Sequence, residues 1–440
     1  MIFAVLIAVL IISFFILWYR KNKSIKTIKK TIPDIEFGIK KEKLQIVHVS
    51  DLHFIDPKLT DSGKYFARNP EKDGRLIQYI DQIVDSFILE MIEKNPDLII
   101  ISGDLTYNGE KTSHEKLSKK LSVLKSKGIE VLLIPGNHDI DNKEARDYSS
   151  EEYEKVESIS SEEFAEIYRD FGYREDEARL ISRDKNSLSY MYMISPKQCV
   201  LMIESSYGKN TNYISNQTFS WIQKVLNIAR ENNLSVISVT HQNILAHNKM
   251  FIEGYKIENS MKLVGVLSEY NVRLNLSGHI HLQHISENQG VVDASVGCIA
   301  LYPNLYANIT VDRRDYIEYK TESLDISKWA YKYGWKNSDL LNFKEKSKEK
   351  FEFFGETMFS NLIKSIPASS EEKKDMEKFI IDSSIAYFSG NMDKYKDYYN
   401  TDNEIYKKWC RYCENTPEMA YLNSICTDNS KCHNKIRINL

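Results

Sequence analysis

The sequence predicts an α/β fold for most of the chain, followed by a helical C-terminal region. From residue 44 onward, short runs rich in Val, Ile and Leu alternate with longer amphipathic stretches, as in a layered α/β domain. After about Glu322 the strand signal almost disappears, and Lys, Glu, Phe and Tyr dominate. At 440 residues the chain is long enough for two or three domains, since single cores usually stop growing near ~250–300 residues.

The α/β part contains several β-branched runs of strand length. The expected strands are Leu44–Ser50, Leu98–Ser102, Val131–Pro135, Ser187–Met193, Gln198–Ile203, Val236–Thr240, Leu282–Glu287 and Ala307–Thr310. Arg75–Lys94 and Glu115–Lys127 have helical spacing, and Pro96 and Gly128 follow them as terminators. Crossovers of this kind place helices on both faces of a sheet and functional loops at the carboxyl ends of its strands.

The last part of the chain, residues 325–440, is expected to form a separate all-helical domain packed against the α/β domain at 44–322. Ser369 and Glu372 are spaced as a capping box ahead of an apolar periodic run, which predicts a helix start there.

The N-terminus differs from the rest because residues 2–19 carry no charge and are almost wholly aliphatic or aromatic. This length is sufficient for a transmembrane helix, so residues 1–20 are predicted to anchor the protein in the cell membrane as a single pass. A cleaved secretory signal is the alternative, but a basic segment before the run and a small-residue cleavage site after it are both lacking. Residues 21–43 form a basic juxtamembrane linker, which favours a cytoplasmic catalytic domain. An outward-facing protein with a solvated basic spacer remains the other interpretation.

The bulk composition excludes one class of partner. Lys and Arg number 59 against 62 Asp and Glu, for a formal net charge of -3. A general nucleic-acid binder would be strongly basic, so nucleic acid is not an expected partner.

Five short motifs stand where strands are expected to end. They are Asp51-Leu52-His53, Gly103-Asp104, Gly136-Asn137-His138-Asp139, His241 and Gly278-His279-Ile280-His281. Each alone is a weak signal, because a lone histidine after a strand is more often structural than a ligand. Their joint occurrence in this order, each after an apolar run, favours one functional site.

The residue types suit a pair of metal ions. Two cations held ~3.5–4 Å apart can bind a phosphoryl group and a hydroxide together, but they need a shared carboxylate and mixed nitrogen and oxygen ligands. Asp104 is suited to the bridging position. The predicted ligands of one metal are Asp51, His53 and His281, and those of the other are Asn137, His241 and His279. This donor set accepts manganese, iron or zinc.

His138 and Asp139 are the predicted catalytic residues. A carboxylate next to the imidazole could orient His138 to stabilise phosphoryl oxygens or to protonate the leaving oxygen. A buried structural histidine is the alternative reading.

Taken together, these motifs resemble the calcineurin-like metallophosphoesterase superfamily over roughly residues 44–322. The resemblance implies a four-layer α/β/β/α sandwich and hydrolysis of a phosphoester by a metal-bridging hydroxide. The segment from Gly103 to Glu110 is most similar to bacterial class III cyclic-nucleotide phosphodiesterases, some of which carry a C-terminal helical domain. Purple acid phosphatases place a tyrosine ligand where Tyr107 stands, but His53 is present here, so Tyr107 is expected to line the pocket.

Three functions follow from this resemblance and from the apolar N-terminus. The first is hydrolysis of a phosphodiester, a cyclic nucleotide above all. The alternative is a phosphoesterase that acts on a phospholipid or a cell-wall lipid phosphate at the membrane. The third is a catalytically inactive binding scaffold, against which the intact set of ligands argues.

Four of the six cysteines cluster near the C-terminus. Cys410, Cys413, Cys426 and Cys432 are compatible with a structural zinc site, with two disulfides or with free thiols.

Overall fold

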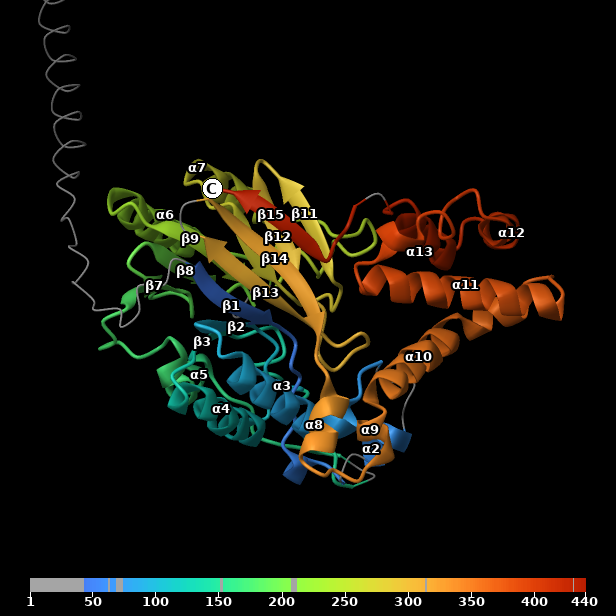
Figure 1. Ribbon diagram of the computed structural model, residues 1–440, viewed down its shortest axis with the longest axis horizontal. Helices are drawn as coiled ribbons and strands as arrows, with labels where there is room; N and C mark the ends of the chain where they lie inside the picture. The colour runs from blue at the N-terminus through green and yellow to red at the C-terminus, as the bar shows by residue number, and fades with distance from the viewer. Residues whose placement is uncertain are drawn as a thin grey trace, which may run out of the picture. The chain divides into compact units, whose positions relative to one another are not determined.

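Two β-sheets form the centre of the protein in the computed structural model (Figure 1). The structure describes residues 43–440 apart from 62–63, 69–73, 151–152, 207–211, 313–314 and 430. The first sheet has six strands in the order β15 (Lys435–Asn439), β14 (Tyr316–Ser323), β13 (Leu305–Asp312), β1 (Lys43–Val49), β2 (Leu98–Ser102) and β3 (Glu130–Ile134). The second has seven, in the order β11 (His284–Asn288), β12 (Val291–Ser295), β10 (Leu274–Ser277), β9 (Ser235–Thr240), β8 (Gln198–Ile203), β7 (Tyr190–Ser195) and β6 (Leu180–Arg183).

Helices cover the outer sides of both sheets, as the α/β prediction requires. The helices are α3 (Ile80–Lys94), α4 (Lys111–Ser126) and α5 (Ser161–Ile167) beside the first sheet, and α6 (Asn216–Glu231) and α7 (Ser260–Glu269) beside the second (Figure 1). β1, β2 and β3 run parallel, and so do β8, β9, β10 and β12. The carboxyl ends of these parallel strands carry the predicted motifs.

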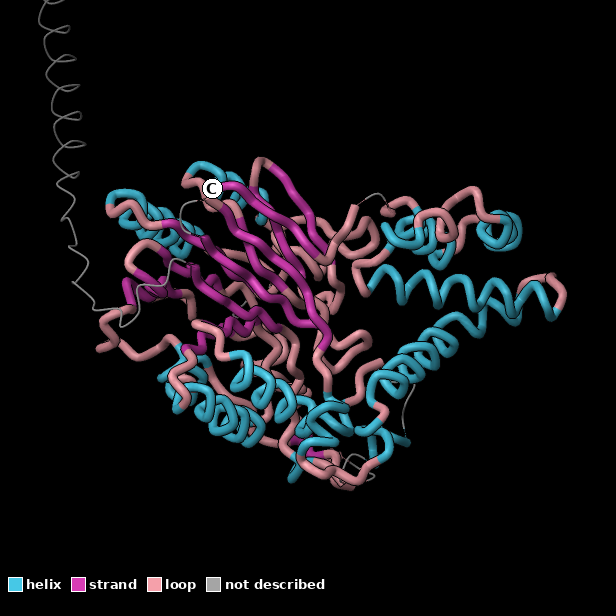
Figure 2. Tube along the Cα trace, viewed as in Figure 1, coloured by secondary structure: helices cyan, strands magenta, loops and turns pink. Residues whose placement is uncertain are grey.

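The C-terminal region is mainly helical but not wholly so (Figure 2). Its helices are α8 (Ile326–Lys332), α9 (Ser338–Leu341), α10 (Phe343–Ser365), α11 (Ser370–Phe388), α12 (Glu404–Cys413) and α13 (Pro417–Cys426). The capping box at the start of α11 is confirmed, with Ser369 and Glu372 making both reciprocal bonds. The expectation of an all-helical domain is wrong at its end, because β15 pairs antiparallel with β14.

The helical region also shares one compact unit with the sheets. A large core cluster joins both sheets with Phe343 and Phe351 of α10. A second cluster fills the space between α10, α11, α12 and α13 and reaches Ile280 and Leu282 of the loop after β10. The helical region therefore packs directly beside the motif that ends in His281.

The predicted N-terminal anchor at 1–20 lies outside the described residues, as does the linker at 21–43 except for Lys43. In the part of the chain that the structure describes, no helix has the length and hydrophobicity needed to cross a bilayer.

Candidate metal centre

The predicted ligands lie on loops at the carboxyl ends of the strands. Asp51 and His53 follow β1, Asp104 follows β2, and His279 and His281 follow β10. All five adopt left-handed backbone conformations, with φ between 45° and 70°. Non-glycine residues pay a conformational cost there, and such residues cluster at functional sites, where the surrounding structure holds them. These backbone conformations therefore direct the five side chains toward one site.

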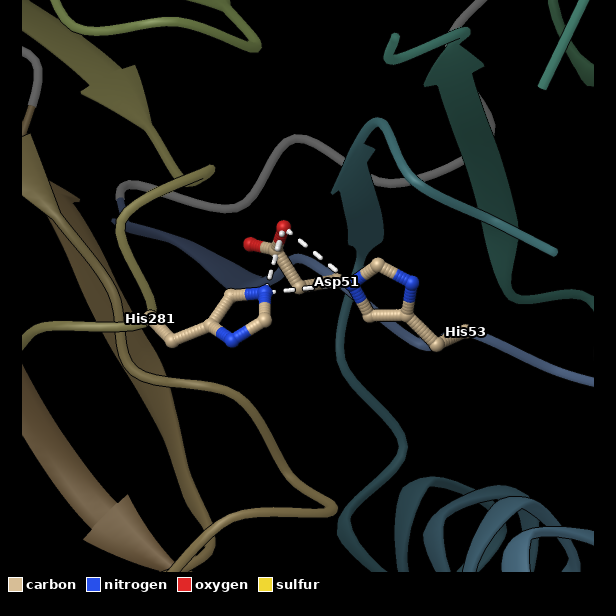
Figure 3. Close-up of side chains that lie close together, drawn as sticks. All are labelled: Asp51, His53 and His281. Carbon is tan, nitrogen blue, oxygen red and sulfur yellow. Dashed lines mark hydrogen bonds and ion pairs between the residues drawn. The ribbon is translucent and has the colours of Figure 1, made fainter. Parts of the chain in front are cut away.

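Asp51, His53 and His281 form one group of potential ligands (Figure 3). The Nε2 atom of His281 lies 3.3 Å from Asp51 Oδ1. The Nε2 atom of His53 lies 3.8 Å from the same oxygen and 3.1 Å from His281 Nε2. Ligands around one ion with bonds of ~2.1 Å lie about 3.0–3.4 Å apart. The distances from His281 to the other two side chains lie in this range, and the distance of 3.8 Å between His53 and Asp51 is slightly longer.

Asp104, His241 and His279 form a second group. The Nε2 atom of His241 lies 3.3 Å from Asp104 Oδ1 and 3.1 Å from Asn137 Oδ1. The other carboxylate oxygen of Asp104, Oδ2, lies 3.7 Å from His53 Nε2. Asp104 therefore presents one oxygen to each group, which is the geometry of a bridging carboxylate.

Neighbouring backbone atoms fix which nitrogen of each histidine is available. The Nδ1–H of His241 donates to the Ser102 carbonyl at 2.8 Å, which directs Nε2 toward Asp104 and Asn137. The Nε2–H of His279 donates to the Gly254 carbonyl at 3.0 Å, which leaves Nδ1 available to a metal ion. Fixing the ring of a ligand through its second nitrogen is common in metal sites.

The electrostatics of the site fit metal ions. Asp51 is fully buried, its Oδ1 atom accepts no hydrogen bond, and its neighbours are the imidazoles of His281 and His53. A buried carboxylate oxygen in this position is costly without a cation. Burial opposes ionisation of Asp104, but the His241 and His138 imidazoles hold the pKa of its carboxyl well below the usual range. Burial lowers the pKa of His279 to about 4, so its imidazole is neutral and able to bind a metal at neutral pH. Two divalent ions therefore suit this donor set.

His241 behaves differently from His279. Burial opposes its protonation, but the Asp104 carboxylate raises the pKa of His241 to about 9. A metal ion bound there must displace this proton, because only the neutral ring is a ligand.

Two glycines let the loops approach the ligands closely. A Cβ atom on Gly136 would collide with Asp104 Oδ1 and come within 2.8 Å of His241 Nε2. A Cβ atom on Gly278 would collide with Ser50 Oγ and come within 2.5 Å of Asp51 Oδ2. These motif positions therefore require glycine for space.

His138 lies at the edge of both groups, where it is half-buried. Its Nε2 atom is 3.9 Å from Asp104 Oδ2. Its Nδ1–H donates to the carbonyl of Tyr107 at 2.8 Å and to Asn108 Oδ1 at 3.0 Å. The ring is thus oriented with Nε2 toward the candidate metal centre.

The expected pairing of Asp139 with His138 is wrong. The Asp139 carboxylate accepts hydrogen bonds from the backbone of Gly136, Leu105 and Thr106 and from the Thr106 hydroxyl. It is fully buried, and burial raises its pKa to about 6. Adjacent side chains in this turn point apart, so Asp139 ties the two loops together and the backbone of Tyr107 orients His138.

Sequence reasoning also missed Arg75 and Asn108. Arg75 stands 5.5 Å over the ring of Tyr107 and lines two cavities beside the site. Tyr107 lines one of these cavities, as expected. Neither Arg75 nor Asn108 occupies a position whose spacing signals a function, although Asn108 follows the Gly103-Asp104 motif closely.

The four C-terminal cysteines are free thiols, with Cys413 and Cys426 buried in the helical core. Among the described residues no three of them come within ligand reach, so the zinc alternative has no support. Two more groups of this kind occur among the described residues: His53, Asp104 and His138 at the motifs, and His284, Asp428 and His433 away from them.

Comparison with known proteins agrees with this geometry. Residues 44–283 match the family described as calcineurin-like phosphoesterase, which is more than half of the chain. The chain belongs to the calcineurin-like phosphoesterase family. Residues 325–431 match a second family, described as the C-terminal domain of cyclic nucleotide phosphodiesterase.

Curated relatives of this calcineurin-like phosphoesterase are distant. It is 26% identical over 195 residues to a probable cyclic nucleotide phosphodiesterase of Ruthia magnifica, covering 44% of this chain and 66% of that one. It is also 24% identical to a 3',5'-cyclic-nucleotide phosphodiesterase of Nostoc sp., and the match covers 46% of this chain and 62% of that one. A probable glycerophosphodiester phosphodiesterase of Arcobacter nitrofigilis is 24% identical, covering 54% and 71%. The chain spans less than two thirds of the length of the first two relatives.

Proposed function

We propose that this chain hydrolyses a phosphodiester, with a cyclic nucleotide as substrate, at two metal ions held on either side of Asp104. The observation that carries the proposal is that the two oxygens of Asp104 face different groups of ligands, 3.3 Å from His241 Nε2 and 3.7 Å from His53 Nε2. When bound, two such ions would polarise the phosphoryl oxygens and lower the pKa of a water molecule toward neutrality.

The protein's own groups prepare the rest of the reaction. With its Nδ1–H held by Tyr107 and Asn108, His138 is positioned to place Nε2 against a phosphoryl oxygen or the leaving oxygen. A proton held at Nε2 can pass to the leaving oxygen as the ester bond breaks. Arg75 lies between the two cavities that flank the site, where its guanidinium suits an anionic phosphodiester.

A pocket on the His138 side supports a nucleotide substrate. It has a volume of about 330 Å³, and its lining includes Tyr65, Tyr148, Arg146 and Lys350 beside Asn108. Aromatic rings together with cations suit a base and a phosphate. The names of the Ruthia and Nostoc relatives, and the second family match at residues 325–431, favour the same substrate.

The test is an assay of the full chain with manganese, iron or zinc against 3',5'-cyclic nucleotides and a generic aryl phosphodiester. We expect metal-dependent turnover, with a loss of two to four orders of magnitude in kcat for His138→Ala. The matched control is His48→Gln, because His48 is buried near the site, its Nε2 atom hydrogen-bonds Ser102, and it belongs to neither group of ligands. No turnover of any ester with any of these metals would refute the proposal.

A further inference from the structure

A large cavity lies next to His281, between the catalytic loops and the C-terminal helices. It has a volume of about 620 Å³. His281 and Arg75 belong to its wall, and the aromatic rings of Phe351, Phe359 and Phe388 line the side formed by the helical region. A group esterified to a phosphate at the metal centre would therefore extend directly into it.

The wall of this cavity offers few hydrogen bonds. Besides His281 and Arg75, four of its described lining residues carry a charge or a hydroxyl group. They are Ser384, Glu418, Tyr255 and Tyr421. The Ser384 hydroxyl is already committed, because it donates to the Ile380 carbonyl at 2.6 Å and accepts from Tyr421 at 3.0 Å. A nucleobase would lose hydrogen bonds to water here without replacement, whereas a hydrocarbon chain has none to lose.

The mouth of the cavity is apolar as well. Met358, Met250 and Tyr255 belong to its lining, yet 60%, 44% and 38% of their surfaces are exposed. Large exposed hydrophobic side chains around an apolar cavity are typical of sites that bind apolar ligands. Met is common at such sites because its flexible side chain adapts to different chains.

We infer that this cavity binds the hydrocarbon chain of an amphiphilic phosphodiester, which gives the protein a second substrate class beside cyclic nucleotides. The inference rests on the proposed phosphodiesterase function. The polar alcohol of such a substrate would lie toward Arg75 and the tyrosine-lined pocket, while its alkyl ester lies among the phenylalanines. In the reaction the oxygen of water bonds to phosphorus and the bond from phosphorus to the polar alcohol breaks. The proton lost by the water balances the proton gained by the alcohol, and the alkyl group stays on the phosphate.

The test compares p-nitrophenyl alkyl phosphates whose alkyl group is methyl, butyl or octyl, with the full chain and manganese. We expect kcat/KM to rise about two- to fourfold for each added methylene until the cavity is full. A parallel measurement needs no turnover: calorimetric binding of methyl-, butyl- and octylphosphonate should show the same dependence on chain length. A flat response in both measurements would overturn the inference. If no ester is hydrolysed, the proposed function fails, and the phosphonate titration alone still supports or overturns the cavity assignment.

A matched pair of variants locates the effect. Met250→Glu combined with Met358→Glu places charges at the mouth, and both positions are exposed enough to tolerate them. We expect this variant to lower the ratio of octyl to methyl kcat/KM at least tenfold. Met261 is equally exposed, at 45%, but lies on α7 outside the cavity lining, so Met261→Glu should leave the ratio unchanged. Both variants keep the apolar N-terminus unchanged. If both lower the ratio of octyl to methyl kcat/KM equally, the chain-length effect belongs to another part of the protein and the inference is overturned.

Discussion

The Nδ1 atom of His138 lies 3.0 Å from Oδ1 of Asn108, and its hydrogen is shared with the carbonyl of Tyr107 at 2.8 Å. Two acceptors facing Nδ1 keep a hydrogen on that nitrogen and hold the plane of the ring. Asn108 is itself held, because its amide nitrogen donates to the Tyr148 hydroxyl at 3.2 Å and its backbone N–H donates to Glu110. The loop after β2 thus positions His138 from the side away from the metal ligands.

Removing this acceptor should slow the reaction without removing metal. For Asn108→Ala we expect a decrease in kcat of roughly three- to tenfold, against two to four orders of magnitude for His138→Ala. The decrease should be larger for poor leaving groups such as alkyl alcohols than for p-nitrophenol, since a poor leaving group needs the proton more. Kinetics on a series of leaving groups measures this difference. An equal decrease across the series would show that Asn108 does not act through proton transfer.

The metal content should follow the two groups of ligands. We expect two ions per wild-type chain, about one in His241→Ala and fewer than one in Asp104→Ala, because Asp104 faces both groups. Mass spectrometry of the dialysed protein with metal standards measures the stoichiometry. His48→Gln, a buried histidine outside both groups, should retain two ions. Two ions in Asp104→Ala would contradict the bridging role.

The glycine at position 278 should be irreplaceable by alanine. A Cβ atom there would displace Ser50 and Asp51, so Gly278→Ala should lose the ion held by Asp51 and most activity. Gly265 is the control, since a Cβ atom there meets nothing within 4 Å and the residue lies inside α7. Gly265→Ala should keep metal and activity and raise the free energy of unfolding by about 0.5–1 kcal/mol. Metal titration and denaturant unfolding of both variants check these outcomes.

Glu110 should make stability depend on pH. Burial raises the pKa of its carboxyl from 4.5 to about 7, and the Asp139 carboxylate adds to this rise. Because the folded state favours the protonated carboxyl, Glu110 contributes its stabilisation below pH 4.5, and this contribution is lost as the pH rises toward 7. The difference in unfolding free energy between wild type and Glu110→Gln should therefore fall by on the order of 3 kcal/mol across this range. Urea unfolding at several pH values tests it, and a constant difference would contradict the raised pKa.

The link between Asp428 and His284 should hold the helical region against the second sheet. Asp428 Oδ2 lies 2.8 Å from His284 Nε2, and the partners belong to the segment after α13 and to β11. Asp428→Ala should lower the local stability of α13 by about 1–3 kcal/mol. Hydrogen exchange in α13 would then be about tenfold faster or more. Asp402→Ala, an exposed carboxylate in the same region, should leave the exchange unchanged.

The convergence of the motif residues could be predicted because each of them follows a strand. Parallel strands end at one sheet edge, so the order of apolar runs and polar motifs was sufficient to place Asp51, after β1, near Asp104, after β2. His281 follows β10 of the second sheet, and its approach to Asp51 was expected only from the resemblance to the metallophosphoesterase superfamily. The strands at Leu98–Ser102 and Gln198–Ile203 have the predicted bounds. Such runs are fully buried, and burial makes their hydrophobic signal strong.

Two features were not predictable for physical reasons. β15 is a short alternating segment, and its partner β14 ends more than a hundred positions earlier, so no local signal selects the pairing. Asp139 was paired with His138 because they are neighbours in sequence, but a turn directs neighbouring side chains to different places. The bonds from Gly136, Leu105 and Thr106 that hold Asp139 depend on the approach of two loops, which the sequence pattern does not encode.

The return of the chain to β14 has a consequence for the helical region. α8 begins directly after β14, and β15 comes back to pair with the same strand, so Tyr316 and Asn439 are neighbours. The helical region is therefore attached to the same sheet edge at both of its ends, and not through a single connection. Loop closure of this kind limits how far the phenylalanine-bearing helices can swing away. Deleting the last six residues would free one end, and we expect the variant to lose selectivity between long and short alkyl chains before it loses the metal centre.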